Sequence, residues 1–226
     1  MIDWSAARDE YCERLGPGLL AEPANALSNA AFFVAAWWLW RMLRREFPQG
    51  LPPGFAALPV LVALIGAGSL AYHTFAVAWA ELLDVLFIGI YIHYFFACFL
   101  RYLVGWPWRW AWIGIPAFAL FSWALTSELP PTLFNGSVMY LPALFGILIV
   151  NTYLRVQRHP DAWYFIAAAT VFVVSLYFRT YDQTWCDRFP LGTHWIWHML
   201  NAVTLTLVTA GLVRGRVDAL QTRDVT

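Results

Sequence analysis

Long apolar stretches recur along the whole chain, and they restrict the fold more than any other feature. Seven stretches of roughly 20 residues carry few charges, at 24–44, 56–76, 82–103, 108–127, 137–156, 162–181 and 193–213. This is the length that an α-helix needs to cross the hydrocarbon core of a bilayer. Proline, glycine or charged residues separate neighbouring stretches, as expected at helix ends. The sequence therefore predicts an all-α, polytopic membrane protein with seven transmembrane helices.

The composition excludes several other classes of protein. Charged residues make up 12% of the 226 residues, and hydrophobic residues make up 61%. Soluble domains average about 25% charged residues. So apolar a chain is not intrinsically disordered, and its net charge of zero argues against nucleic-acid binding through a basic surface.

Arginine is distributed unequally between the two sides of this predicted topology. One side receives Arg41, Arg44, Arg45, Arg101, Arg109, Arg155, Arg158, Arg214, Arg216 and Arg223, and the other only Arg8, Arg14, Arg179 and Arg188. Because cytoplasmic loops are enriched in positive residues, we expect the N-terminus outside and the C-terminus in the cytoplasm. The chain then divides into an exoplasmic acidic segment at 1–23, a transmembrane domain at 24–213 and a cytoplasmic tail at 214–226. Abundant arginine without lysine favours a bacterial source, and hence the inner membrane.

Five polar side chains lie at a common depth in the predicted spans, near the exoplasmic face. Ser69 and His73 fall in the outer half of the second span, Asp84 about one turn into the third, and His194 and His198 in the first two turns of the last. Taken singly, each has a structural explanation, such as a hydrogen-bonded core histidine, a serine that packs helices, or an aspartate paired with an arginine or histidine. Ionisable residues inside a membrane are costly and mark function by default. Their shared depth therefore favours a functional site.

The histidine spacing is typical of zinc. His194 and His198 are four residues apart, on one helical face and about 6 Å apart along the axis. His73 from a neighbouring helix would complete a three-histidine site with one open position, the pattern of catalytic zinc. Zinc polarises a carbonyl and activates water. Asp84 is placed to take the proton of that water and later protonate a leaving amine, and Ser69 to donate to the developing oxyanion.

Acidic residues precede the first span, on the exoplasmic side. Gly16 and Gly18 permit a tight turn beside them, and several carboxylates around a turn suit calcium. A solvated acidic segment accounts for the spacing equally well. The carboxylates are Asp9, Glu10, Glu13 and Glu22.

Two cysteines also fall on the exoplasmic side of this topology. Cys12 lies in the acidic segment and Cys186 in the loop before the last span, so a disulfide between them would clamp the segment over the outer helix ends. Arg179 and Asp182, close to Cys186, are either an ion pair or a support for the histidine site.

Other functions fit the same spans. A non-enzymatic seven-helix lipid receptor or binding protein with a structural zinc is the main alternative, and the open zinc position beside Asp84 and Ser69 argues against it. A transporter is disfavoured because the sequence has no inverted repeat and no pair of broken helices at mid-membrane.

Taken in order, the motifs of the chain resemble the alkaline ceramidase family. That family belongs to a wider group of seven-helix membrane hydrolases, which also includes adiponectin and progestin receptors and hemolysin-III-like proteins. The resemblance spans nearly the whole chain, and its motifs are specific as an ordered set. They are Glu10-Tyr-Cys-Glu13, Ala21-Glu22-Pro-Ala-Asn25-Ala-Leu-Ser28-Asn29, Gly68-Ser69-x-x-x-His73, Leu83-Asp84 and His194-x-x-x-His198.

The resemblance implies a chemistry for these residues. It implies zinc held by His73, His194 and His198, with Ser69 and Asp84 completing the catalytic group. It also implies hydrolysis of the amide bond of ceramide, or of a related N-acyl lipid, to a long-chain amine and a fatty acid. The substrate would come from the lipid bilayer, and no obligate protein partner is implied.

The resemblance implies a calcium site as well, at Glu10, Glu13 and Glu22. The sequence departs from the family there, because a glutamate stands where the animal enzymes have aspartate, Leu15 stands where they have asparagine, and the loop is shorter.

Two further pairs of residues match the family. Cys12 and Cys186 match the positions of its disulfide, and Trp197 and Tyr140 match positions that contact the head group of the substrate.

Overall fold

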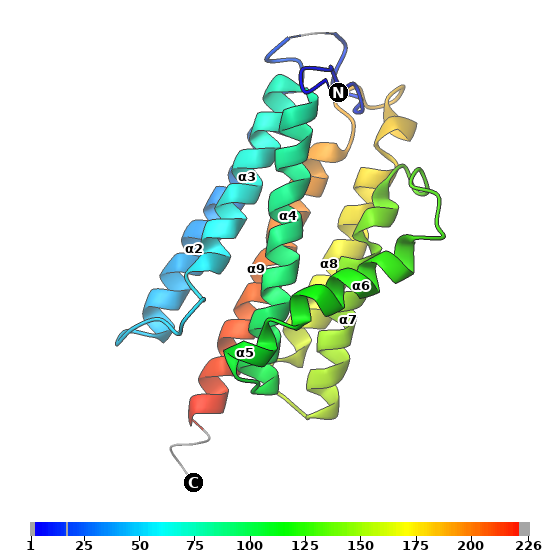
Figure 1. Cartoon of the computed structure of the whole chain (residues 1–226). Helices are drawn as coiled ribbons and strands as arrows, with labels where there is room; N and C mark the ends of the chain where they lie inside the picture. Colours follow the sequence, from blue (N-terminus) through cyan, green and yellow to red (C-terminus); the bar gives the residue numbers. More distant parts are fainter. Residues whose placement is uncertain (1–2, 17, 222–226) are drawn as a thin grey trace.

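The computed structural model describes residues 3–16 and 18–221, and this part of the chain forms helices and no β-strand. The helices run alongside one another, with the N-terminal segment at one end and the last turns of α9 at the other, and α6 crosses the front obliquely (Figure 1). The prediction of an all-α protein is confirmed. The helices are α1 (Pro23–Ser28), α2 (Ala30–Glu46), α3 (Ala57–Phe75), α4 (Ala78–Phe99), η1 (Leu100–Val104), α5 (Trp108–Ala111), α6 (Gly114–Thr126), η2 (Ser137–Tyr140), α7 (Leu141–Val156), α8 (Ala162–Thr180), η3 (Asp182–Trp185) and α9 (His194–Gln221).

Five helical segments are long and apolar enough to cross a membrane, as expected of a multi-pass membrane protein. They are Ala57–Phe75, Ala78–Val104, Ser137–Val156, Ala162–Thr180 and His194–Val217. The stretches predicted at 24–44 and 108–127 are also helical, but each is divided into two shorter helices. Asn29 separates α1 from α2, which has 17 residues, and α6 has 13.

The helix ends follow the sequence at the start of the bundle and depart from it at the end. α1 begins at Pro23, as predicted, because proline suits the first position of a helix. α9 continues beyond the predicted boundary at 213 to Gln221. Arg214, which ends the apolar stretch, lies 3.1 Å from Glu46 of α2 and so packs on the bundle as part of the helix. Residues 222–226 of the predicted tail lie outside the described residues.

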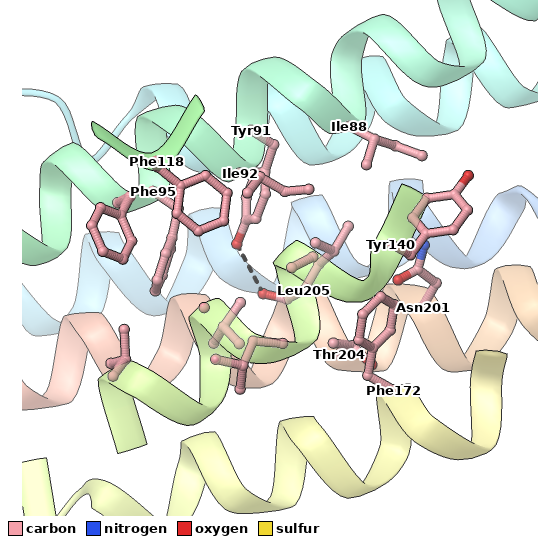
Figure 2. Close-up of a pocket in the computed structure, with 16 residues that line it drawn as sticks. Ile88, Tyr91, Ile92, Phe95, Phe118, Tyr140, Phe172, Asn201, Thr204 and Leu205 are labelled. Carbon is pink, nitrogen blue, oxygen red and sulfur yellow. Dashed lines mark hydrogen bonds between the residues drawn. The ribbon is translucent and has the colours of Figure 1, made fainter. Parts of the chain in front are cut away.

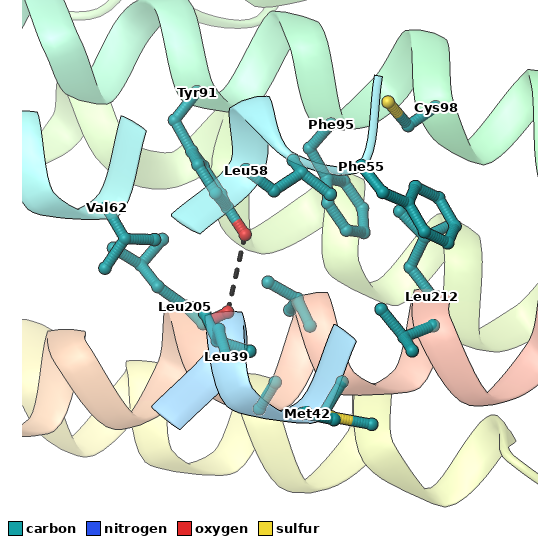
Figure 3. Packing of buried hydrophobic residues seen from close by; sticks show 14 of the residues in the cluster. Leu39, Met42, Phe55, Leu58, Val62, Tyr91, Phe95, Cys98, Leu205 and Leu212 are labelled. Carbon is teal, nitrogen blue, oxygen red and sulfur yellow. Dashed lines mark hydrogen bonds between the residues drawn. The ribbon is translucent and has the colours of Figure 1, made fainter. Parts of the chain in front are cut away.

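The apolar core fills the bundle on the side away from the N-terminal segment. Figure 3 shows side chains of α2, α3, α4 and α9 packed together, among them Leu39, Val62 and Phe95. One buried polar group in this core has partners, since the Tyr91 hydroxyl lies 2.6 Å from Thr209 Oγ1. The polar end of the bundle is therefore held on a rigid apolar base.

A glycine brings α3 and α4 into close contact at the polar end. A Cβ atom added to Gly68 would lie 2.6 Å from the main-chain oxygen of Leu83. Small residues at helix interfaces let the backbones approach in this way. The next residues along each helix are Ser69 and Asp84, so the contact at Gly68 sets the distance between two predicted catalytic residues.

Candidate metal centre

Three buried histidines meet at the polar end of the bundle. His73 comes from the last turns of α3, and His194 and His198 from the first two turns of α9. Each is at most 2% exposed, and one ligand atom from each lies within 4.8 Å of the others. The structure thus brings together the three histidines that the sequence predicted as metal ligands.

Two neighbouring groups fix the orientation of the rings. Glu22 Oε2 lies 2.6 Å from His73 Nδ1, and Ser28 Oγ lies 2.7 Å from His198 Nδ1. Metal-binding histidines usually engage a carboxylate or hydroxyl through the nitrogen that does not face the metal. Glu22 directly precedes α1 and Ser28 is its last residue, so this short helix is part of the centre.

The nitrogens left over fit a metal ion. Within the described residues, the buried Nε2 of His73 and Nδ1 of His194 have no hydrogen-bond partner. A buried polar atom without a partner is costly, and a metal ion would satisfy it. Imidazole is a ligand that suits zinc, copper, iron and nickel, so the cluster can hold a divalent transition metal.

The two predicted catalytic residues lie beside this cluster. Ser69 is 3% exposed and its Oγ is 3.4 Å from His198 Nε2. Asp84 interacts electrostatically with His73 and lines a polar cavity of about 540 Å³. The Asp84 carboxylate therefore links the polar cavity to the histidine cluster, and the Ser69 hydroxyl lies against the cluster itself.

The N-terminal segment contacts the centre through Tyr11. Its ring stacks on His194 with the centroids 3.8 Å apart, and it also lines the polar cavity. Burial raises the pKa of the Tyr11 hydroxyl well above its usual value, so the side chain stays neutral. Tyr11 thus joins the cavity to the histidine cluster.

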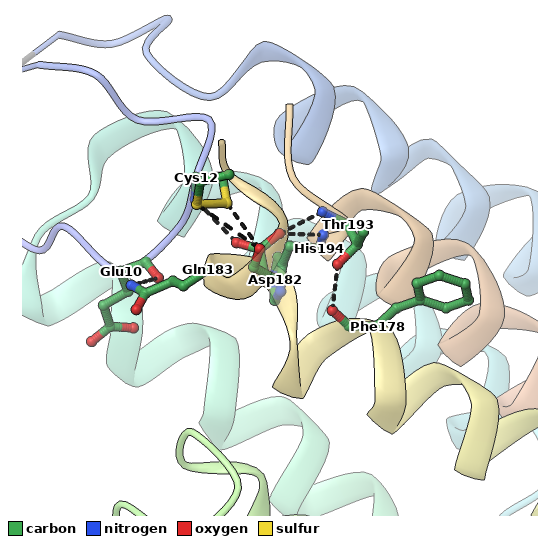
Figure 4. The surroundings of a disulfide bond; sticks show 8 residues. Glu10, Cys12, Phe178, Asp182, Gln183, Thr193 and His194 are labelled. Atoms are coloured by element: carbon green, nitrogen blue, oxygen red, sulfur yellow. Dashed lines mark hydrogen bonds between the residues drawn. A yellow bond between two sulfur atoms is a disulfide. The ribbon is translucent and has the colours of Figure 1, made fainter. Parts of the chain in front are cut away.

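A disulfide holds this segment in place. Cys12 and Cys186 are bonded, with their Cα atoms 5.2 Å apart, and they join positions 174 residues apart in the chain. Figure 4 shows the bond beside η3, with Glu10 and Gln183 close by. The predicted pairing is confirmed.

Asp182 supports the first turn of α9. Its Oδ1 accepts the backbone N–H groups of Thr193 at 2.5 Å and His194 at 2.9 Å, and its Oδ2 accepts that of Cys12 at 3.0 Å (Figure 4). A carboxylate at a helix N-terminus satisfies free N–H groups and complements the helix dipole. Of the two interpretations of Asp182, the structure favours support of the histidine site.

Arg179 contacts other groups than Asp182. Its guanidinium donates to Asn135 O and Ser137 Oγ, each at 3.0 Å. It lies 5.0 Å from the ring centroid of Tyr140 and 5.9 Å from that of Trp197. Arg179 therefore ties the segment before α7 to α8, beside the two aromatic residues predicted to contact a head group.

Tyr140 stands between two cavities of different character. It lines the polar cavity together with Asp84 and Arg179, and also a narrow apolar cavity between the helices. Figure 2 shows the apolar cavity, where Tyr140 lies at the end nearest Ile88 and Phe118 lies farther along. Trp197 packs against Tyr140 with ring centroids 4.9 Å apart. The polar and apolar spaces thus meet at this aromatic pair.

The acidic residues of the N-terminal segment accept hydrogen bonds from the protein. Glu13 accepts the backbone N–H groups of Ala24 and Asn25, at 2.6 and 2.8 Å. Glu10 accepts the Tyr72 hydroxyl at 2.9 Å. These carboxylates therefore serve as hydrogen-bond acceptors within the protein, and calcium binding by them stays a prediction.

Glu22 is the most enclosed of these carboxylates. It is 3% exposed, and its Oε1 lies 2.6 Å from the Nε of Arg14. Burial disfavours the ionised form, but hydrogen bonds, chiefly from His73 and Arg14, outweigh it and hold the pKa of Glu22 below its usual range.

Sequence reasoning missed several contacts of the centre. Glu22 was predicted as a calcium ligand, and Ser28 and Tyr11 appeared only within motifs, so none of the three was predicted to contact a histidine ring. No spacing rule links residues that lie 51 or 170 positions apart, as Glu22 and Ser28 do from their histidines. A buried histidine needs a partner for its second nitrogen, and this is the one signal that would have prompted a search.

The structure defines the class of the protein, and comparison with known proteins identifies its family. The fold and the three-histidine cluster define a helical membrane protein with a buried centre that can hold a metal ion. The model of the Ceramidase family matches residues 7–223, and the chain belongs to that family. Membership implies an amide hydrolase that acts on ceramide-like lipids. A search of curated proteins gave no match.

Proposed function

We propose that the protein is a zinc-dependent intramembrane amidase, which hydrolyses ceramide or a related N-acyl lipid to a long-chain amine and a free fatty acid. The observation that carries the proposal is the cluster of His73, His194 and His198, with unpartnered nitrogens, in a chain of the Ceramidase family. Zinc held there would polarise the amide carbonyl and favour ionisation of water.

The residues of the chain divide the remaining work. The three histidines bind the ion, while Glu22 and Ser28 orient two of the rings. Asp84 accepts a proton from the attacking water as the new C–O bond forms, and Ser69 donates a hydrogen bond to the oxyanion. Asp84 then returns the proton to nitrogen as the C–N bond breaks, which releases the amine and the fatty acid.

The cavities suggest how a lipid would lie. The hydrocarbon chains would follow the apolar cavity between the helices, and the head group would occupy the polar cavity, with Tyr140 and Trp197 at the boundary. The substrate would then present its amide at the histidine cluster.

The arginine distribution supports the proposed topology. We place seven membrane crossings along the chain, with the segments at 24–44 and 108–127 joining the five long helices. The arginine-rich ends would face the cytoplasm, and the N-terminal segment and the histidine cluster would lie near the exoplasmic face.

Metal analysis and product release from purified protein test the proposal. We expect about one zinc per chain and release of fatty acid from ceramide or from other N-acyl lipids. Asp84→Asn should lower turnover by about 10²–10⁴-fold, as loss of a general acid–base does. His73→Ala should abolish zinc binding and turnover together.

His93→Ala is the matched control, because the hydrogen bond that the described residues give His93 stays within its own helix, to Gly89 O at 2.7 Å. It should keep both zinc and activity. Stoichiometric zinc without turnover on any amide lipid would contradict the amidase and favour the lipid-receptor alternative.

A further inference from the structure

A buried arginine occupies the N-terminal segment where acidic residues converge. The Arg14 side chain is 6% exposed, and its Nε lies 2.6 Å from Oε1 of Glu22, whose side chain is 3% exposed. Its Nη1 also lies 3.4 Å from Gly16 O. A guanidinium keeps its positive charge in any protein environment, so a permanent cation already stands beside the most buried carboxylate of the segment.

The neighbouring oxygen atoms are also committed to donors. Both oxygens of Glu13 accept N–H groups that start α1, and the second oxygen of Glu22 faces His73 Nδ1 and Asn25 Nδ2. Calcium needs six to eight oxygen ligands whose lone pairs point at the ion. Here each of the four carboxylate oxygens of Glu13 and Glu22 already faces at least one nitrogen donor, and Oε2 of Glu22 faces two. These residues therefore do not fit a calcium ion.

Leu15 gives the same indication. Its side chain is 89% exposed and offers no oxygen atom. The segment thus has fewer ligands than a calcium site requires, and it has a positive charge that would repel the ion.

We infer that the guanidinium of Arg14 supplies the charge that calcium would otherwise provide, so that the segment closes over the metal centre without a bound cation. The consequence reaches the centre through a short chain of contacts. Arg14 holds Glu22, and Glu22 holds the ring of His73. Arg14 is thus a positioning residue for His73, with Glu22 and His73 between it and the proposed ion.

A second ion pair of the same segment offers a matched control. Arg8 lies 2.5 Å from Glu81, but the two side chains are 34% and 37% exposed. Exposed ion pairs contribute little to stability, whereas removal of one partner from a buried pair is strongly destabilising. Arg8→Gln and Arg14→Gln therefore remove the same charge from the same segment in different surroundings.

Calcium binding is measured first on the unaltered protein. Protein equilibrated with about 10 mM calcium chloride, which fills even sites with a dissociation constant of about 1 mM, is compared with protein in calcium-free buffer. We expect no calcium to stay with the protein after rapid desalting and no change in the melting temperature. One retained calcium per chain, with a rise in melting temperature, would overturn the inference.

The variants then test the positioning role. Arg14→Gln should lower the melting temperature by roughly 6–20 °C, and Arg8→Gln by less than about 4 °C. Below both melting temperatures, Arg14→Gln should bind zinc about 10–100-fold more weakly in competition with a coloured chelator. Arg14→Lys, which keeps the charge, should recover part of the zinc affinity.

If Arg14→Gln has the same melting temperature and zinc affinity as Arg8→Gln, the positioning role is refuted. If Arg14→Gln fails to fold, Arg14→Lys and the calcium measurement on the unaltered protein still decide the question. Only the zinc comparison rests on the proposed function. If the three histidines hold no zinc, the proposed function fails, while the calcium and melting measurements still test Arg14.

Discussion

Substitution of Gly68 by alanine tests how closely the centre depends on helix packing. The added Cβ would lie 2.6 Å from Leu83 O, against at least 3.4 Å for an ordinary contact. α3 and α4 must then separate locally by about 0.8 Å, since neither backbone can yield otherwise. Ser69 and Asp84, the next residues of the two helices, would move apart by a similar amount.

Two effects of different size are expected. Overpacking costs about 1–3 kcal/mol, which corresponds to a fall of roughly 2–12 °C in melting temperature for a chain of this length. A displacement of about 1 Å between reacting groups costs on the order of 10²-fold in rate. Gly68→Ala should therefore lose a much larger share of its activity than the modest fall in melting temperature would explain. Its zinc content should stay unchanged, because no histidine is altered.

The assay is kcat/KM for release of fatty acid, together with thermal unfolding and zinc content. Gly89→Ala, in the same helix pair, is the control, because a Cβ at Gly89 meets no atom within 4 Å. It should be as stable as the unaltered protein or slightly more so, since alanine favours a helix. Equal activity and melting temperature in the two variants would refute the proposed role of Gly68.

Three further outcomes follow from contacts around the centre. Asp182→Asn replaces the charged acceptor at the start of α9 with a neutral one and should lower the melting temperature by about 3–12 °C. Thermal unfolding measures this, and an unchanged melting temperature would show that the N–H groups find other acceptors. Reduction of the bond between Cys12 and Cys186 should destabilise the protein by about 2–5 kcal/mol. Unfolding with and without a phosphine reductant measures this change, and an unchanged unfolding midpoint would contradict a clamping role. Ser28→Ala removes the partner of His198 Nδ1 and should weaken zinc binding about 10–100-fold in competition with a chelator. Thr74→Ala, which removes a hydrogen bond to Leu70 O in the same helix, is the control and should leave zinc binding unchanged.

Much of the fold was predictable because hydrophobic periodicity and length act locally. The apolar stretches gave helices close to their observed bounds, and Pro23 marked a helix start. The end of α9 was not predictable, because hydropathy falls at Arg214 while backbone hydrogen bonding continues to Gln221. An ion pair with Glu46 lets this charged turn pack on the bundle.

The histidine cluster was predictable for a similar reason. His194 and His198 share a helical face by spacing alone, and topology placed His73 at the same depth. The partners of the rings depend on contacts between distant segments, which no local pattern encodes. The acidic segment shows the same limit, because a sequence displays the carboxylates but not the buried position of Arg14 beside Glu22.

The disulfide also bears on how the protein is made. It joins residue 12 to residue 186, and the histidines beside it come from the third and the ninth α-helix. A chain emerging from the ribosome holds His73 long before it holds His194. The centre therefore has no complete ligand set until His198 has been synthesised, and the covalent bond that secures Tyr11 over it needs Cys186, which also comes late in the chain. Activity would thus be confined to fully synthesised, oxidised molecules, and truncated products would be inert.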